Sequence, residues 1–222
     1  MEIVYQEIND ILLEKMIAHK EGEYMSKKII IINGHPAAGK TTFAMRLSEE
    51  FKIPYLAKNT FKNAVSASAA ITDQSESSRF SAITFDAIIY VTERLMEVEK
   101  PLIIEGSFAA HGFVKSDGSQ KIDEAAVIKS LIDKYDYTPL TYIFTGDTQI
   151  LHKRFLEREK LNERGANAVL YEMTHDYFSE ICRHQERFNI GGELIKIDTT
   201  DFGKVDFKSH IESARLFIHG NK

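Results

Sequence analysis

Residues 29–42 read IIIINGHPAAGKTT, in which four isoleucines lead directly into the pattern Gly34-x-x-x-x-Gly39-Lys40-Thr41. Consecutive β-branched apolar residues are typical of a parallel strand that is buried on both faces. The residues that follow have helical spacing, with apolar side chains repeated on one face. A glycine-rich turn between a buried strand and a helix is the setting in which this pattern binds phosphate. The stretch therefore predicts an α/β fold of the P-loop NTPase class.

The loop also predicts which groups hold a nucleoside triphosphate. Glycine lets the backbone curl so that successive N–H groups face an anion, and the helix that begins near Lys40 adds the positive end of its dipole. We expect Lys40 to reach the β- and γ-phosphates and the Thr41 hydroxyl to bind Mg²⁺. The expected contacts to ATP in this loop are Gly34, His35, Pro36, Ala37, Ala38, Gly39, Lys40, Thr41 and Thr42.

The composition limits the alternatives. With 222 residues and 43% apolar side chains, the chain can bury one full core but is short for two domains. The net charge of −5 argues against a protein that mainly coats nucleic acid. A single cysteine, Cys182, excludes an internal disulfide and a cysteine-based metal cluster. Because no apolar run is long enough to span a membrane and no signal-peptide pattern is present, we expect a cytoplasmic protein with no membrane partner.

The chain divides into two unequal parts. Apolar residues at helical spacing predict an appended amphipathic helix over residues 1–24, which ends in a polar stretch. Residues 25–222 form the P-loop domain.

Past the loop, strand patterns alternate with helical patterns. We predict strands at 54–57, 101–106, 140–144 and 193–197, and helices at 79–98, 123–134, 147–160, 167–188 and 205–219. The alternation predicts a five-stranded parallel sheet with helices on both faces. Ligands of such a sheet collect at the carboxyl ends of its strands, where we expect Gly34, Asn59, Glu105, Thr145 and Asp198. Residues 60–78 show little periodicity and are predicted to be an irregular segment on the substrate side.

Glu105 ends an otherwise apolar predicted strand and is followed by Gly106, which would let a ligand approach closely. A carboxylate at this place can orient the waters of a magnesium ion or accept a proton, so Glu105 is a candidate metal ligand and catalytic residue. The alternative is an acidic residue that follows a strand by chance.

Arginines follow the fourth strand of the core. Arg154 and Arg158 are one helical turn apart and share a face, and Arg164 comes shortly after them. On a kinase-like lid segment such side chains stabilise the negative charge of a transferred phosphoryl group. The alternative is a solvated helix with ion pairs such as Lys153 with Glu157.

These pieces resemble a family of small P-loop kinases labelled AAA-family ATPase-like, which is similar to polynucleotide kinase, zeta toxin and chloramphenicol phosphotransferase. The resemblance covers nearly all of residues 27–203 and is carried by the segments 34–42, 55–62, 102–108, 154–164 and 197–202. It implies a kinase-like domain over residues 25–222 that uses ATP and Mg²⁺. It also implies that the turn with Asp198 and Thr199 lies near the base of the nucleotide and that Arg154 contacts the nucleotide.

Asn59 departs from the resembled family. Related phosphotransferases tend to have an aspartate after the second strand that accepts the proton of the substrate hydroxyl, and this chain has Asn59 at the matching place. A neutral amide cannot act as a general base, although it can position a hydroxyl by hydrogen bonding. Three readings stay open: Glu105 supplies the base, the transfer needs little base assistance because its transition state is loose, or the protein binds nucleotide and is a poor kinase.

The sequence therefore favours an ATP- and Mg²⁺-dependent phosphotransferase that acts on a hydroxyl of a small molecule. A nucleoside monophosphate kinase and a non-kinase ATP-binding or ATPase module are the alternatives, and a nucleic-acid end is a less favoured acceptor. A GTPase switch is disfavoured because no guanine-reading Asn/Thr-Lys-x-Asp tetrapeptide follows a strand. The sequence indicates neither the acceptor nor the oligomeric state.

Overall fold

The computed structural model describes residues 27–67, 74–112, 120–160 and 173–220. The predicted helix in residues 1–24 and Arg164 lie outside these residues. The strands are β1 Lys28–Gly34, β2 Tyr55–Ala57, β3 Leu102–Glu105, β4 Thr138–Thr145 and β5 Glu193–Asp198. The helices are α2 Lys40–Phe51, α3 Lys58–Ala67, α4 Gln74–Glu97, α5 Glu124–Tyr135, α6 Thr148–Lys160, α7 His175–Gln185 and α8 Phe207–His219, with a short 3-10 helix, η1, at Phe202–Lys204.

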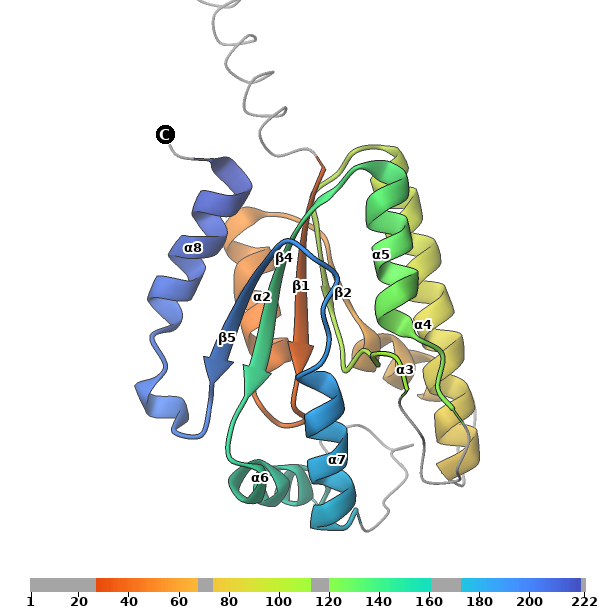
Figure 1. The fold of residues 1–222 in the computed structure, drawn as a ribbon, viewed down its shortest axis with the longest axis vertical. Helices are drawn as coiled ribbons and strands as arrows, with labels where there is room; N and C mark the ends of the chain where they lie inside the picture. Colours follow the sequence, from red (N-terminus) through yellow and green to blue (C-terminus); the bar gives the residue numbers. More distant parts are fainter. Residues whose placement is uncertain (1–26, 68–73, 113–119, 161–172, 221–222) are drawn as a thin grey trace, which may run out of the picture.

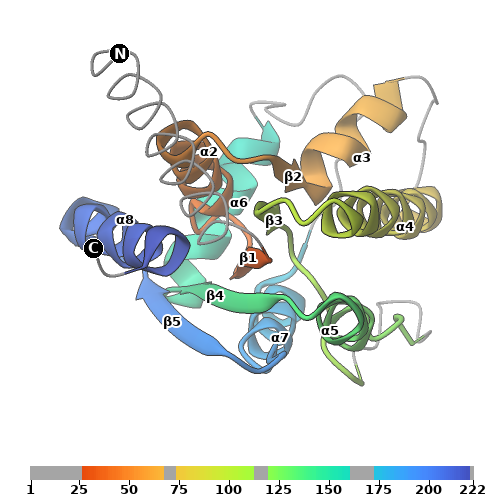
Figure 2. The ribbon, with the colours of Figure 1, turned by 90° about the horizontal axis from the view of Figure 1, so that it is seen from above.

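The strands form one parallel sheet in the order β2-β3-β1-β4-β5. Helices cover both of its faces, with α2 and α8 on one and α4 and α5 on the other (Figure 2). The predicted five-stranded α/β fold is therefore confirmed. The arrows of β1, β4 and β5 point in the same direction in Figure 1, and α6 and α7 lie beyond their carboxyl ends.

The four isoleucines of β1 divide the core between the two faces. Ile30 and Ile32 pack in the cluster that includes Phe43 of α2, whereas Ile29 and Ile31 pack in the cluster that includes Phe85 of α4. All four isoleucines are completely buried, because β1 is the central strand and successive side chains point to opposite faces. Burial of each contributes about 1.5–3 kcal/mol of transfer free energy.

The end of β1 approaches β4 more closely than any side chain permits. Gly34 has φ +123°, and a Cβ atom placed on it would lie 2.1 Å from the carbonyl oxygen of Phe144. The next residue, His35, donates its backbone N–H to the same carbonyl at 2.8 Å. Gly34 therefore joins the sheet to the loop at a point where only glycine fits.

The prediction of an irregular segment at residues 60–78 is wrong for the residues that the structure describes. Helix α3 runs to Ala67 and α4 begins at Gln74, earlier than the predicted start at residue 79. Serine and alanine are tolerated in helices, but they give no apolar periodicity from which a helix can be recognised. Lys62 of α3 donates to the hydroxyl of Ser77 in α4 at 2.6 Å, so contacts between the two helices supply order that the local pattern does not show.

The remaining boundaries differ little from the predictions. β2 begins after Pro54, which has no N–H to donate to a neighbouring strand. Helix α7 begins at His175, where the Thr174 side chain caps it, and the earlier residues of the predicted helix at 167–188 are outside the described part as far as residue 172. None of the described helices has the length and apolar character needed to cross a membrane.

Replacing Gly34 by alanine is expected to lower the free energy of unfolding by about 3 kcal/mol or more, because the new methyl group would overlap backbone atoms of β4. Gly191→Ala is the matched control, since Gly191 has φ +83° but open space around its Cβ position. It should cost about 1–2 kcal/mol from the backbone conformation alone. Chemical denaturation of both variants measures the difference, and equal losses would contradict the close approach.

Candidate active site

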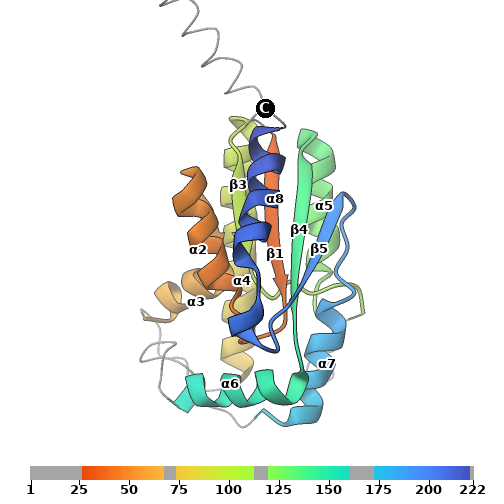
Figure 3. The same ribbon diagram turned by 90° about the vertical axis from the view of Figure 1, so that its left-hand side faces the viewer.

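A cavity of about 300 Å³ lies where the loop after β1 meets the ends of the neighbouring strands. Its lining includes residues 36–42, Asn59, Glu105 and Arg158. Figure 3 shows α2 rising from the loop and α6 running across the carboxyl ends of the strands. The parallel sheet thus brings together residues from four separate parts of the sequence. Residues 36–42, Glu105 and Arg158 make up the part of the cavity that we call the phosphate end, whereas Gly34 and His35, which were also predicted to contact ATP, are not in its lining.

The loop turns tightly between the end of β1 and the start of α2. Ala37 has φ +59° and Gly39 has φ +87°, so two residues adopt the left-handed conformation between the strand and the helix. Lys40 is 6% exposed, and its Nζ atom donates to the carbonyls of Gly34 at 2.8 Å and His35 at 2.6 Å. The ammonium group is therefore held against the backbone at the start of the loop, since a buried charge needs such partners.

Thr41 and Glu105 form the second part of the phosphate end. The Thr41 hydroxyl donates to Oε2 of Glu105 at 3.1 Å, and Glu105 is 1% exposed. Its Oε1 atom has no hydrogen-bond partner among the described residues. Burial raises the pKa of Glu105, although Lys40, the Thr41 hydroxyl and Arg158 oppose this rise.

This pair fits a magnesium ion. A hydroxyl and a carboxylate are hard oxygen ligands, and Mg²⁺ usually keeps several waters beside one or two protein ligands. The unpartnered Oε1 atom leaves ligand capacity inside the cavity. Within the described ranges, no three His, Cys, Asp or Glu side chains cluster closely enough to hold a metal by themselves. Thr41 and Glu105 therefore suit a metal whose other ligands are phosphate oxygens and waters.

The two predicted arginines occupy different places. Arg158 lines the cavity and acts electrostatically on Glu105. Arg154 instead donates from its guanidinium to the carbonyls of Thr199 and Thr200, both at 2.8 Å. It thereby fixes the turn after β5. The catalytic and nucleotide-contact roles of Arg154 stay predictions.

The turn after β5 is held by its own hydrogen bonds. Asp198 accepts from the N–H of Thr200 at 2.8 Å, and hydrogen bonds with Thr200 lower the pKa of this carboxyl. Thr199 donates from its N–H and its hydroxyl to the Thr145 carbonyl, each at 2.9 Å. Asp198 and Thr199 therefore shape the backbone of the turn, and their predicted nearness to a base stays a prediction.

Asn59 lies in the first turn of α3 and lines the cavity together with Ser81 and Ser107. Amide and hydroxyl groups thus face the same space as Glu105. The sequence singled out Asn59 but not the two serines, which lie in a helix and a loop without a recognisable motif. The cavity therefore has uncharged hydrogen-bonding groups beside its phosphate end.

His35 connects the loop to α7. Its ring is buried, and Nε2 lies 3.0 Å from Oε1 of Glu186, the residue that follows α7. Burial lowers the pKa of His35, and Glu186 partly offsets this effect. The His35 ring therefore ties the loop to the end of α7. No local sequence pattern indicates Glu186 as its partner.

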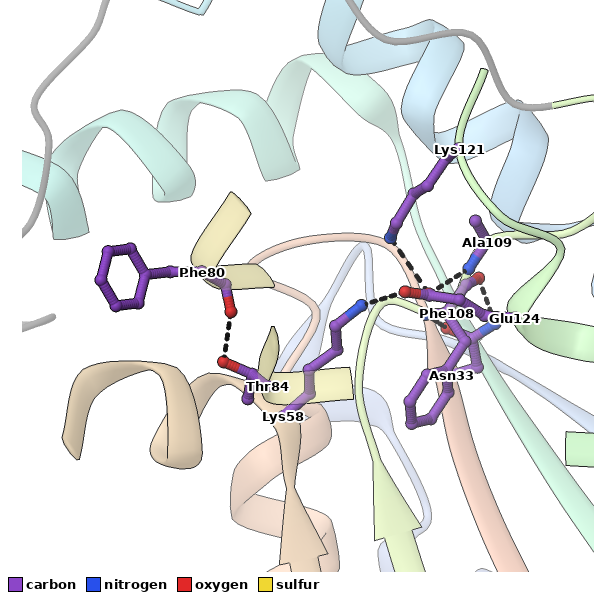
Figure 4. A network of polar contacts seen from close by, with 8 residues as sticks. All are labelled: Asn33, Lys58, Phe80, Thr84, Phe108, Ala109, Lys121 and Glu124. Carbon is purple, nitrogen blue, oxygen red and sulfur yellow. Dashed lines mark hydrogen bonds and ion pairs between the residues drawn. The ribbon is translucent and has the colours of Figure 1, made fainter. Parts of the chain in front are cut away.

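A buried ionic cluster next to the cavity was not predicted from the sequence. Lys58 and Lys121 both donate to Glu124, at 2.5 Å to Oε1 and 3.0 Å to Oε2, and the N–H of Ala109 donates to Oε2 at 2.8 Å (Figure 4). Burial and the charge of Lys121 lower the pKa of Lys58 to about 7. Burial opposes the ionisation of Glu124, but the two lysines outweigh it and lower the pKa of the carboxyl.

The cluster also holds the segment after β3. Asn33 at the end of β1 exchanges two hydrogen bonds with the backbone of Phe108, at 2.9 Å and 3.2 Å. Together with the bond from Ala109 to Glu124, these contacts fix the path of residues 106–109 beside the cavity. The only sequence signal was indirect, because Lys58 directly precedes Asn59 and Glu124 lies in the first turn of the helix predicted at 123–134.

Comparison with known proteins supports the fold. Neither a protein-family model nor a curated protein matches the sequence. A candidate kinase from Chloroflexus aurantiacus J-10-fl has a similar solved structure, with a TM-score of 0.70 at 20% identity over 89% of this chain and 100% of that chain. A gluconokinase from Sinorhizobium meliloti 1021 and a sugar kinase from Janibacter sp. HTCC2649 both give a TM-score of 0.51.

The gluconokinase shares 13% identity with this chain, and the match covers 86% of this chain and 91% of the gluconokinase. The sugar kinase shares 11% identity, and the match covers 86% of this chain and 94% of the sugar kinase. Similarity at these identities establishes a shared fold. The chain therefore has the α/β fold of these kinases, and the narrower resemblance to polynucleotide kinase, zeta toxin and chloramphenicol phosphotransferase stays a prediction.

Replacing Glu105 by glutamine is expected to raise the melting temperature of the ligand-free protein at and above neutral pH. Because burial raises the folded-state pKa of Glu105 above its ordinary value, the ionised carboxyl destabilises the fold at pH values above that folded pKa. The gain should shrink as the pH falls toward the ordinary carboxyl range, where Glu105 takes up a proton. Thermal melts across pH measure it, and a lower melting temperature at every pH would contradict this reading.

Proposed function

We propose that the protein transfers the γ-phosphate of ATP, with Mg²⁺, to a hydroxyl group of a small molecule. The observation that carries this proposal is the single cavity that joins the loop with Lys40, the pair of Thr41 and Glu105, and Arg158. A transferred phosphoryl group carries spread negative charge, and positioned cations and backbone N–H groups stabilise it. The shared fold with solved kinases supports the same proposal.

The residues at the phosphate end divide the work of binding the nucleotide and the metal ion in this proposal. The backbone of residues 36–42 holds the phosphates, and Lys40 exchanges its carbonyl partners for phosphate oxygens. Thr41 and Glu105 hold the metal ion, whose chemistry when bound is to neutralise charge on the phosphates. Arg158 lies on α6, where it can contact the transferred group. These roles use the cations that the structure places at the cavity.

The acceptor is proposed to lie beside Asn59, Ser81 and Ser107. Their amide and hydroxyl groups can orient a substrate hydroxyl, but none of them is basic enough to remove its proton. Glu105 is the carboxylate at the cavity, but a carboxylate that holds a metal ion is a weak base, so its two predicted roles exclude each other and the metal role is the one proposed here. A loose transition state leaves the proton in place until late in the transfer, which reduces the need for a base.

A small hydroxyl compound is favoured over the alternatives. Gluconokinase and sugar kinase are the printed names of two proteins with this fold, and both names describe small hydroxyl acceptors. A nucleoside monophosphate kinase and an ATP-binding module without an acceptor remain the competing functions. Release of ADP with a broad panel of hydroxyl compounds separates them. Stabilisation by magnesium-bound ATP without acceleration by any acceptor would favour the ATP-binding module.

Lys40→Ala is expected to abolish the rise in melting temperature that magnesium-bound ATP produces and to reduce turnover by about 100-fold or more. The physical reason is the loss of the cation at the phosphates. Lys208→Ala, a change at an exposed lysine in α8, is the control and should leave both quantities unchanged. Unchanged stabilisation by ATP in Lys40→Ala would refute the proposed phosphate site.

Asn59→Ala is expected to lower kcat/KM for the acceptor by about five- to tenfold, the effect of one lost hydrogen bond. The KM for ATP should stay the same because Asn59 lies in α3, outside the loop that holds the phosphates. Steady-state kinetics with each substrate varied in turn distinguish the two effects. An increase in the KM for ATP alone would place Asn59 at the nucleotide instead.

A further inference from the structure

The cluster of Lys58, Lys121 and Glu124 has an unbalanced charge. Two ammonium groups share one carboxylate, and the third contact of that carboxylate is the neutral N–H of Ala109. The side chains of Lys58 and Glu124 are 5% and 0% exposed, so solvent screens their charges weakly. With both lysines protonated, a state that the Lys58 pKa of about 7 favours at and below neutral pH, the cluster carries a net charge of +1 beside the cavity.

Lys121 is the member of the cluster whose positive charge lies at the cavity. Its side chain is 17% exposed, and it lines the cavity together with Asn59, Ser81 and Ser107. Lys58 lies behind it, enclosed by the rings of Phe85 and Phe108 at 5.2 Å and 5.9 Å from its Nζ atom. Figure 4 shows the two lysines directed toward Glu124 from different elements. An anion in the cavity can therefore reach Lys121, whereas Lys58 is covered.

The second positive charge of the cluster is not needed to hold the fold together. Lys58 alone neutralises Glu124, and Ala109 already uses the carboxylate to fix the segment after β3. A second lysine raises the cost of the buried cation, since Lys121 and burial together lower the pKa of Lys58 to about 7. An anion bound beside Lys121 would relieve that repulsion. The other cations of the cavity, Lys40 and Arg158, act on Glu105 at the phosphate end.

We propose that Lys121, supported by Lys58 and Glu124, is an anion subsite for the acceptor, so that the acceptor is a hydroxyl compound bearing a carboxylate or a phosphate monoester. This substrate class rests on the proposed phosphotransfer to a hydroxyl. Lys121 binds the anionic group by a charge-assisted hydrogen bond, while the amide and hydroxyl groups of Asn59, Ser81 and Ser107 face the uncharged part. Lys58 is a positioning residue that acts through Glu124.

The test measures binding separately from turnover. Melting temperatures are recorded with magnesium and a non-hydrolysable ATP analogue present, so that the phosphate end is filled. The added probes are matched sets of a neutral polyol, its carboxylate and its phosphate ester: glycerol, glycerate and glycerol 3-phosphate, and sorbitol, gluconate and sorbitol 6-phosphate. At least one anionic probe should raise the melting temperature at concentrations at which its neutral counterpart does not. The carboxylate and phosphate arms show which anion the subsite accepts.

Lys121→Gln should weaken binding of that anionic probe by about tenfold or more, the effect of one charge-assisted hydrogen bond. Its melting temperature without the probe should stay within the wild-type range, because Lys58 still neutralises Glu124. Lys129→Gln removes an exposed lysine of α5 that pairs with Asp133 and is the matched control, with unchanged binding expected.

Binding of no anion in the panel above its neutral counterpart would overturn the proposal, as would equal binding by Lys121→Gln. Anion binding that depends on Lys121 without any ADP release would support the subsite and refute the proposed kinase function. ADP release with a neutral polyol as fast as with its anionic counterparts would refute the subsite and leave the kinase function standing.

Discussion

The close approach between Gly34 and the Phe144 carbonyl is the constraint on which the site depends. The backbone leaves β1 close beside β4 and turns at once into the loop, and only glycine fits at this point because a Cβ atom would overlap the backbone of Phe144. That turn sets the start of α2 at Lys40 and holds its ammonium group over the loop carbonyls. It also places Thr41 within hydrogen-bond distance of Glu105 on the neighbouring strand β3. One contact in the sheet thus determines the spacing of the cation, the hydroxyl and the carboxylate.

The charged groups around the cavity form two sets with different consequences. Lys40 and Arg158 act on Glu105, and all three are near the loop that is proposed to hold phosphate. Lys58 and Lys121 act on Glu124, behind and beside the uncharged groups of the cavity. The first set is the one proposed to hold the phosphates of a nucleotide. A module that only binds nucleotide would not require the second set, which is proposed to give the acceptor part of the cavity its preference for an anion.

The sequence predicted those parts whose signals are local. The loop pattern and the alternation of strands and helices predicted the sheet. Glu105 and Asn59 were placed at its carboxyl edge because Glu105 ends one predicted strand and Asn59 comes shortly after another. Residues 60–78 were misjudged because serine and alanine give no periodicity. Glu186 and Glu124 were missed since their partners lie 151 and 66 residues away, and only the packed fold brings them together. The arginines of α6 share a helix face in the sequence, yet their contacts differ.

The most direct test of the phosphate site is a crystal structure with magnesium and a non-hydrolysable ATP analogue. Lys40 should then leave the carbonyls of Gly34 and His35 and contact β- and γ-phosphate oxygens, with Thr41 and Glu105 directed toward the metal ion. A structure in which Lys40 keeps both carbonyl partners while the phosphates bind elsewhere would contradict the role assigned to this loop.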